Sequence, residues 1–150
     1  MHPAESAVLL GDLLGYRSVA VAPGAAHGVL EVGTAFGPRM RPQAGNIVAD
    51  VFDALARSAP LPIAGSEDRL LHLTWIDDVA RSILALGESP QPARRACEGT
   101  IVSVAELVDA VAQTVGLLPP GVAARAPDER LANAFLATYR WFLRRAESAA

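Results

Sequence analysis

The stretch that decides the fold runs from residue 33 to residue 80 and is bounded by two short motifs, Gly37-Pro38-Arg39-Met40 and Thr74-Trp75-Ile76-Asp77-Asp78-Val79-Ala80. The first motif predicts a turn, because Pro fixes the backbone angle φ that a turn needs and Gly adopts backbone angles that other residues avoid. Residues 46–59 place apolar side chains at helical spacing, and residues 69–74 have the apolar character of a strand. The order of loop, helix, strand and second helix predicts an α/β chain.

The start of the second helix carries two acidic residues. Thr74 and Asp77 have the spacing of a weak capping box, and the helix is predicted to continue through Leu86. Asp77 and Asp78 are then favoured as carboxylates that interact with the positive end of the helix dipole. A pair of acids for acid–base chemistry is the other interpretation.

The flanking segments predict further elements. From periodicity and turn residues we expect a helix over 4–14 and strands over 17–22 and 28–33. Further along we expect a short edge strand over 61–64, a loop over 88–95 and a strand over 99–102. Ser103-Val104-Ala105-Glu106 is a full capping box that begins a helix ending at Gly116, and Asp128 begins a last helix that runs to about Glu147. We therefore expect a small mixed sheet with four to five helices, in one domain over residues 1–150.

Composition excludes several classes of protein. The 150 residues have a net charge of −3 and no basic run, which argues against a nucleic-acid partner. Without an apolar run of about 18 residues or a basic leader, the sequence predicts no membrane segment and a cytoplasmic location. The single Cys97 excludes an internal disulfide and is expected to be a buried hydrophobe. The three His residues do not have metal-ligand spacing, so no metal site is predicted.

All thirteen basic residues are Arg, and the chain contains no Lys. A sequence rich in Ala, Arg, Gly and Pro without Lys is typical of a bacterial genome of high G+C content. Such bacteria contain many polyketide pathways.

The order and spacing of these motifs over about residues 28–115 resemble the C-terminal half of the NAD-dependent epimerase/dehydratase family, the extended short-chain dehydrogenases, and UDP-glucuronate decarboxylases most of all. The resemblance implies a remnant of that fold. The family's Tyr-x-x-x-Lys pair cannot exist in a chain without Lys, and its G-x-x-G-x-x-G motif has no counterpart here. We therefore expect the N-terminal dinucleotide-binding half to be lacking, and no cofactor.

The resemblance also implies which residues line a substrate cleft. Met40, Trp75 and Tyr16 stand at such positions. Tyr16 lies closer to Gly28 than the family's catalytic Tyr lies to the aligned Gly, so it does not match that Tyr in spacing. Leu71 occupies the place of the Arg that clamps a pyrophosphate in family enzymes, which replaces an anion site by an apolar wall. Packing in the core is the competing interpretation of these large side chains.

Two kinds of role are assigned to this set of residues. Tyr16, His72 and Trp75 are the candidate catalytic residues, with Tyr16 or His72 as a hydrogen-bond donor to a carbonyl and Trp75 as a wall that shapes the substrate. A structural, hydrogen-bonded His remains the alternative for His72. The candidate substrate-binding residues are Arg39, Met40, Arg69, Leu71 and Leu73.

Three functions remain open. The first is a cofactor-independent cyclase or isomerase, possible in a pericyclic or cycloaddition form, that shapes an apolar polyketide-like substrate by proximity and orientation. The second is a non-catalytic binding or regulatory protein derived from nucleotide-sugar epimerases and dehydratases. The third is a decayed gene product, which the intact capping boxes argue against. Removing a parallel sheet from this fold exposes apolar strands, so we expect a homo-oligomer, a dimer or larger.

Overall fold

The computed structural model describes residues 10–11, 16–21, 28–88, 93–118 and 126–149. The chain divides into two compact units, of which unit 1 comprises residues 1–35 and 71–101 and unit 2 comprises residues 36–70 and 102–150. That residues 1–150 form a single domain stays a prediction.

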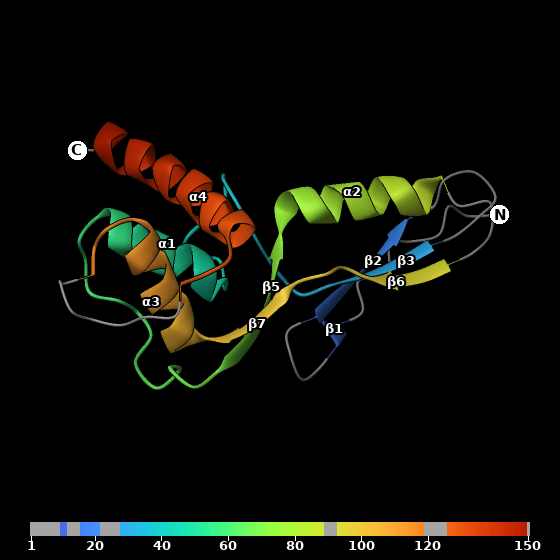
Figure 1. Ribbon diagram of the computed structural model, residues 1–150, viewed down its shortest axis with the longest axis horizontal. Coiled ribbons are helices and arrows are strands. Elements are labelled where there is room, and N and C mark those ends of the chain that lie inside the picture. The colour runs from blue at the N-terminus through green and yellow to red at the C-terminus, as the bar shows by residue number, and fades with distance from the viewer. Residues whose placement is uncertain (1–9, 12–15, 22–27, 89–92, 119–125, 150) are drawn as a thin grey trace. The chain divides into compact units, whose positions relative to one another are not determined.

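Unit 1 contains a four-stranded sheet in the order β1-β2-β3-β6 (Figure 1). Its strands are β1 (Leu10–Gly11), β2 (Tyr16–Val21), β3 (Gly28–Val32) and β6 (Ala93–Ala96). The first three are antiparallel neighbours, and β3 and β6 are parallel. The sheet is therefore mixed, as the sequence predicted.

Helix α2 (Ile76–Gly87) covers β3 in unit 1. The core between them is a cluster of apolar side chains made of Leu30, Val32, Val79, Leu86 and Cys97. The approach is close at Gly28, where an added Cβ would lie 2.6 Å from Leu86 Cδ2. Cys97 is 3% exposed within this cluster, which confirms its expected role as a buried hydrophobe, and the burial raises the pKa of its thiol.

A second sheet has three strands in the order β4-β5-β7. They are β4 (Thr34–Phe36), β5 (Leu70–Trp75) and β7 (Thr100–Ser103). Strand β4, which the sequence did not predict, comes directly before the Gly37-Pro38-Arg39-Met40 motif.

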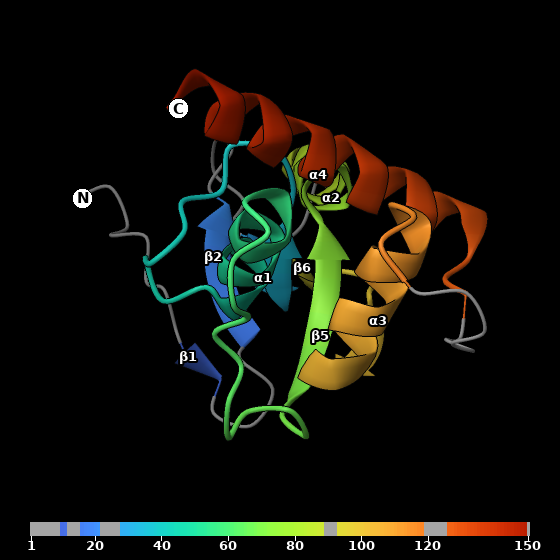
Figure 2. The same cartoon turned by 90° about the vertical axis from the view of Figure 1, so that its left-hand side faces the viewer.

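Unit 2 is built from three helices, which are α1 (Ile47–Ala56), α3 (Val104–Thr114) and α4 (Glu129–Ser148). Helix α4 packs on both α1 and α3 (Figure 2). The core contains four phenylalanines, with centroid separations of 5.5 Å for Phe36–Phe135, 6.0 Å for Phe52–Phe135 and 6.1 Å for Phe52–Phe142. Such ring pairs add stability beyond the area that they bury.

Each helix of unit 2 begins at a side-chain cap. Asn46 Oδ1 accepts a hydrogen bond of 3.0 Å from Val48 N, and Asp128 Oδ1 accepts one of 2.8 Å from Leu131 N. Ser103 and Glu106 form the predicted reciprocal capping box, with bonds of 3.1 and 2.7 Å. These caps satisfy backbone N–H groups that have no partner within the helix, so they fix where each helix begins.

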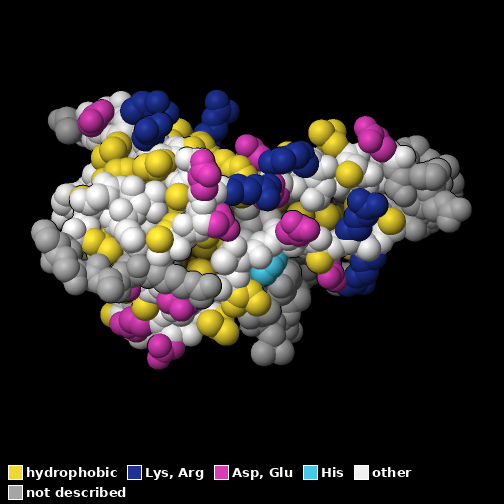
Figure 3. Space-filling model, viewed as in Figure 1, with side chains coloured by type: hydrophobic (Ala, Val, Ile, Leu, Met, Phe, Trp, Pro, Cys, Tyr) yellow, Lys and Arg dark blue, Asp and Glu magenta, His cyan; other side chains and the backbone are white. Residues whose placement is uncertain are grey.

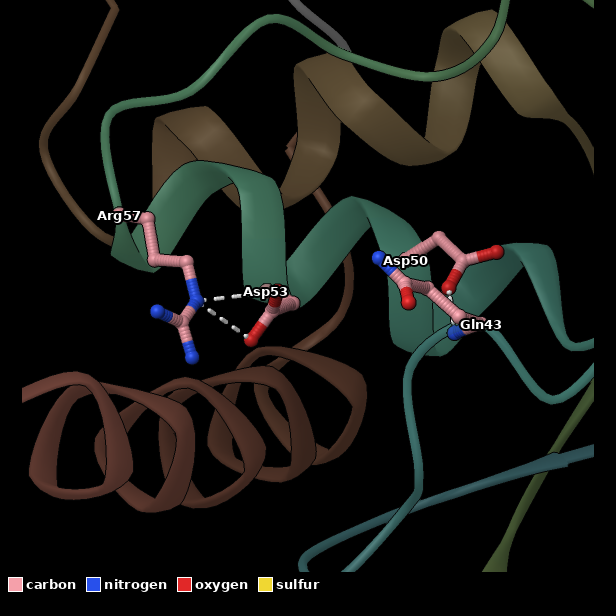
Figure 4. A network of polar contacts seen from close by, with 4 residues as sticks. All are labelled: Gln43, Asp50, Asp53 and Arg57. Carbon is pink, nitrogen blue, oxygen red and sulfur yellow. Dashed lines mark hydrogen bonds and ion pairs between the residues drawn. The ribbon is translucent and has the colours of Figure 1, made fainter. Parts of the chain in front are cut away.

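Polar contacts along α1 tie the preceding loop to the helix (Figure 4). Gln43 N donates to Asp50 Oδ1 at 2.5 Å, and Arg57 Nε lies 3.0 Å from Asp53 Oδ1 one turn along the helix. The loop from Pro38 to Gly45 therefore ends against the first turns of α1.

Four predictions of local structure were wrong in part. Leu10–Gly11 is a strand rather than part of a helix, and the rest of 4–14 lies outside the described residues. Residues 62–65 form a turn in place of the edge strand over 61–64, because Ser66 N bonds back to Ile63 O at 2.8 Å and Gly65 has a positive φ of 77°. Residues 93–96 pair with β3 instead of remaining a loop.

The fourth error concerns the start of α2. Trp75, not Thr74, is the N-cap residue, and it makes no side-chain capping bond. Thr74 remains in β5, where its side chain is buried. The other strands and helices agree with the predictions to within a few residues. Among the described residues, no helix combines the length and apolar character that crossing a membrane requires.

We expect Ser103→Ala to lower the free energy of unfolding by about 1 kcal/mol, because the substitution removes the Oγ that accepts the bond from Glu106 N. Chemical denaturation monitored by circular dichroism measures the change. Gln113→Ala, an exposed site on the same helix, is the control and should change stability by less than about 0.5 kcal/mol. Equal losses in both variants would contradict a capping role.

Candidate functional site

Strand β5 carries four of the eight predicted site residues. Leu71 and Leu73 lie on one side of the strand and His72 lies on the other with Thr74, because side chains alternate along a strand. These four side chains, of Leu71, His72, Leu73 and Thr74, are buried, and His72 has 8% of its surface exposed. Trp75, which ends the strand, is half-buried.

Two glycines make room for the His72 side chain. A Cβ added at Gly99 would lie 2.6 Å from His72 Cε1 and 2.8 Å from Nε2, and one added at Gly33 would lie 2.9 Å from Cγ. Both glycines also approach the backbone of β5, at His72 O and Leu73 O. No other amino acid fits at either position without moving the strand or the imidazole, so the ring is held in one place.

Burial fixes the charge of this imidazole. It lowers the pKa of His72 below the ordinary value, since the charged form loses its solvation. At neutral pH the ring is therefore uncharged, with one nitrogen that donates a hydrogen bond and one that accepts. A group in this state is able to donate to or accept from a carbonyl or hydroxyl.

Thr74 lies two residues further along the same side of β5 and is fully buried. Its Oγ1 has no hydrogen-bond partner among the residues that the structure describes. A buried hydroxyl without a partner costs free energy relative to an apolar group of the same shape.

The start of α2 places two carboxylates beyond Trp75. Asp77 and Asp78 are in the first turn of the helix, as expected for acids near the positive end of a helix dipole. Asp78 Oδ1 lies 3.1 Å from Arg81 Nη2, one turn further on. This ion pair favours a structural role for Asp78 over acid–base chemistry.

Three of the predicted site residues belong to unit 2. Arg39 is exposed and has a positive φ of 69°, which is the geometry of the third residue in a turn that has Pro at its second position. Met40 is half-buried, and its Sδ accepts a contact of 3.7 Å from Asn46 Nδ2. Arg69 is exposed, precedes β5 and holds the start of α3 through a 3.0 Å bond from Val104 N to its carbonyl.

Tyr16 is the first residue of β2 in unit 1 and is paired with Gly11 of β1. Its side chain lies outside the described part of the structure. The residues that the structure brings together are therefore those of β5, with Gly33 and Gly99 beside them. The roles of Tyr16, Arg39, Met40 and Arg69 stay predictions.

Sequence reasoning missed Gly33 and Gly99 as the residues that seat His72, and it assigned Thr74 to a cap. The signal was present in part, because both glycines stand directly before short β-prone segments. Which side chain a glycine accommodates depends on strand pairing, which one sequence does not give. Among the described residues, no group of three His, Cys, Asp or Glu side chains is placed to hold a metal ion.

The two fully buried threonines provide a matched test of the Thr74 hydroxyl. We expect Thr74→Val to leave the free energy of unfolding unchanged or to raise it by about 1 kcal/mol, because no hydrogen bond is lost. Thr138→Val should lower it by about 1 kcal/mol, because Thr138 Oγ1 donates to Ala134 O at 2.8 Å. Chemical denaturation of both variants decides this, and a larger loss at Thr74 would show that its hydroxyl is bonded.

The lowered pKa of His72 predicts a pH dependence of stability. As the pH falls below about 6.5, the unfolded chain takes up a proton at this residue before the folded chain does, so stability decreases. We expect His72→Gln to show a smaller loss of melting temperature between about pH 7 and pH 5.5 than the wild type. Carboxylates titrate at lower pH in both proteins. An identical pH profile for the two would contradict a buried neutral His72.

Comparison with known proteins finds a likeness in structure. No family model matches the sequence, and no curated protein matches it. UDP-glucose 4-epimerase from Thermotoga maritima, solved with UDP-glucose, has a TM-score of 0.64 and 19% identity over 79% of this chain and 46% of its own. UDP-glucuronic acid 4-epimerase from Bacillus cereus, solved with UDP-glucuronic acid and NAD, has a TM-score of 0.61 and 18% identity over 77% and 44%.

An epimerase from the methanogen Methanothermobacter thermautotrophicus is similar to the same degree, with a TM-score of 0.59 and 22% identity. The chain spans about half or less of the length of each of these proteins. The finer resemblance to UDP-glucuronate decarboxylases stays a prediction. The small α/β arrangement expected from the motifs is confirmed, and the chain has part of the fold of the nucleotide-sugar epimerases.

Proposed function

We propose that the chain is a cofactor-independent cyclase or isomerase that acts on an apolar, polyketide-like substrate. The observation that carries the proposal is His72, an imidazole kept uncharged by burial and held in place by Gly33 and Gly99. A fixed neutral imidazole is suited to polarise a carbonyl or to move a proton without a change of net charge.

The expected chemistry needs no redox partner. Holding a flexible substrate in a reactive conformer supplies up to about 7–11 kcal/mol of barrier lowering in the best intramolecular cases. In this proposal His72 bonds the carbonyl or hydroxyl whose charge changes as the ring closes. Trp75, which ends β5 on the side of Leu71 and Leu73, supplies an apolar wall at the end of the strand. A cycloaddition-type closure is the specific form that we favour.

Two further features support a non-redox reaction. The sequence contains no Lys, so it cannot form the Tyr-x-x-x-Lys pair of the dehydrogenases that it resembles. Leu71 stands where those enzymes have a pyrophosphate-binding Arg, and its side chain is buried in β5. The first difference removes a pair that the redox step with nicotinamide would need, and the second removes a group that a nucleotide sugar would need.

The second candidate is a non-catalytic protein that binds a nucleotide sugar. It is favoured by the fold, because epimerases with this fold have been solved with UDP-glucose and with UDP-glucuronic acid. It also gives a role to Arg39 and Arg69, whose exposed guanidinium groups are suited to phosphate oxygens.

A panel of ligands separates the two candidates. A ligand at 100 times its dissociation constant raises the free energy of unfolding by about 2.7 kcal/mol, which a thermal-shift assay detects in a chain of this size. We expect apolar polyene and macrolide-like compounds to stabilise the protein, and UDP-sugars and nicotinamide nucleotides not to. Stabilisation by a nucleotide sugar alone, lost in Arg39→Ala or Arg69→Ala, would put the binding protein in place of the cyclase.

Once a compound that is turned over has been found, two substitutions assign the roles. His72→Gln should lower the rate of product formation by about 100-fold or more, the usual effect of losing a general acid or base. Trp75→Phe should lower it less and alter the product distribution. Trp141→Phe, a half-buried Trp on α4, is the matched control and should leave turnover unchanged. Full turnover by His72→Gln would exclude His72 from the reaction.

A further inference from the structure

The last turns of α4 carry three exposed arginines, Arg140, Arg144 and Arg145, beside one exposed carboxylate, Glu147. Arg140 and Arg144 are exposed one helical turn apart, so they point in similar directions. The guanidinium carbon of Arg145 lies 5.6 Å from the centre of the Trp141 ring, a cation–π arrangement. Arg57, Arg81 and Arg94 form ion pairs in the structure, whereas Arg140, Arg144 and Arg145 form none with any described residue. We call these three arginines and Trp141 the basic end of unit 2.

The turns of α4 that carry the basic end also contribute side chains to the core of unit 2. Phe142 is buried, and the Trp141 ring stands edge-on to it with centroids 4.8 Å apart. Burial raises the pKa of Tyr139, which lies on the same turns. Because the apolar side of α4 packs on α1 and α3, the arginines project from a fixed helix instead of a flexible tail.

An acidic surface lies around the start of α3 in the same unit. Its residues are exposed and are Glu67, Asp68, Glu106 and Asp109. Ala105 N donates to Glu67 O at 3.0 Å, which holds the turn containing Glu67 and Asp68 beside the first turn of the helix. Arg69 is the one basic residue in this group, so the surface has a net charge of −3. We call it the acidic end of unit 2.

The two ends lie on opposite sides of unit 2. In Figures 1 and 2 the C-terminal turns of α4 are at the top, and the start of α3 and the turn before β5 are at the bottom. Figure 3 shows dark blue side chains at the top of this unit, with magenta side chains beside them, and magenta without dark blue at its bottom. The charges therefore cannot neutralise each other within one unit.

We propose that copies of this chain associate head to tail, with the basic end of one copy bound to the acidic end of the next. The two surfaces have opposite charge and are present in equal number on every copy, which is the condition for a heterologous interface. The planar guanidinium groups bind carboxylates with two parallel hydrogen bonds, and Trp and Arg are enriched at the energetic centres of protein interfaces.

Two other anionic partners, nucleic acid and a lipid surface, fit the basic end less well. Nucleic acid would be repelled by the net charge of −3 on the chain as a whole. A lipid surface binds amphipathic helices through an exposed apolar side, and the apolar side of α4 is buried against α1 and α3. A carboxylate surface needs neither a positive chain nor an inserted helix.

Sedimentation velocity over a range of protein concentrations tests the association. Attraction between exposed charges extends about 30 Å at an ionic strength of about 0.01 M and about 3 Å at about 1 M. We expect assemblies larger than one chain at low salt that dissociate at high salt. Arg140→Glu with Arg144→Glu, and separately Asp68→Arg with Asp109→Arg, should each weaken association by about tenfold or more.

Mixing the two double variants is the decisive experiment. The end made acidic in one variant then faces the end made basic in the other, so association should return. Arg41→Glu with Arg95→Glu is the control of equal charge change at exposed arginines outside both ends, and it should associate like the wild type. A chain that remains monomeric at low salt, or double variants that fail to restore association when mixed, overturns the proposal. Binding of anionic phospholipid vesicles or of a DNA oligonucleotide through Arg140 and Arg144, without self-association, also overturns it.

Discussion

The close approach of β5 to Gly33 and Gly99 is the constraint on which unit 1 depends. The imidazole of His72 fills the space that a side chain at either glycine would need, and the carbonyl groups of β5 lie against the same two positions. Strand β5 leads without a loop into α2, because Trp75 is both the last residue of the strand and the residue at the N-cap position of the helix. The position of β5 therefore determines where Val79 and Leu86 meet β3 to form the core. A single buried histidine thus links the geometry of the second sheet to the packing of α2.

Unit 2 is stabilised in a different way. Its four phenylalanines come from β4, α1 and α4, so segments distant in the sequence meet through aromatic contacts. The starts of its helices are fixed locally by Asn46, Ser103 and Asp128. Local caps set where each helix begins, and the rings set how β4, α1 and α4 pack together. The same helices carry the charged surfaces at the two ends of the unit.

The chemistry of the candidate site follows from burial more than from residue type. An exposed histidine titrates near physiological pH, whereas His72 is held neutral because its charged form would lose solvation. Leu71, on the opposite side of the strand, is buried. The fold is shared with nucleotide-sugar epimerases, and β5 combines the buried apolar side chains of Leu71 and Leu73 with the buried polar side chains of His72 and Thr74.

The sequence by itself determined the elements whose signals are local. The capping box at Ser103, the cap at Asp128 and the apolar periodicity of α1, α3 and α4 need only neighbouring residues, and they were predicted to within a few positions. The motifs around Arg39 and Asp77 were also sufficient to predict the shared fold. Only the tertiary structure decided that β6 pairs with β3, that Thr74 stays in a buried strand and that Gly33 and Gly99 enclose His72. These features depend on contacts between segments far apart in the chain, and such contacts are set by strand pairing and side-chain packing that no local pattern encodes.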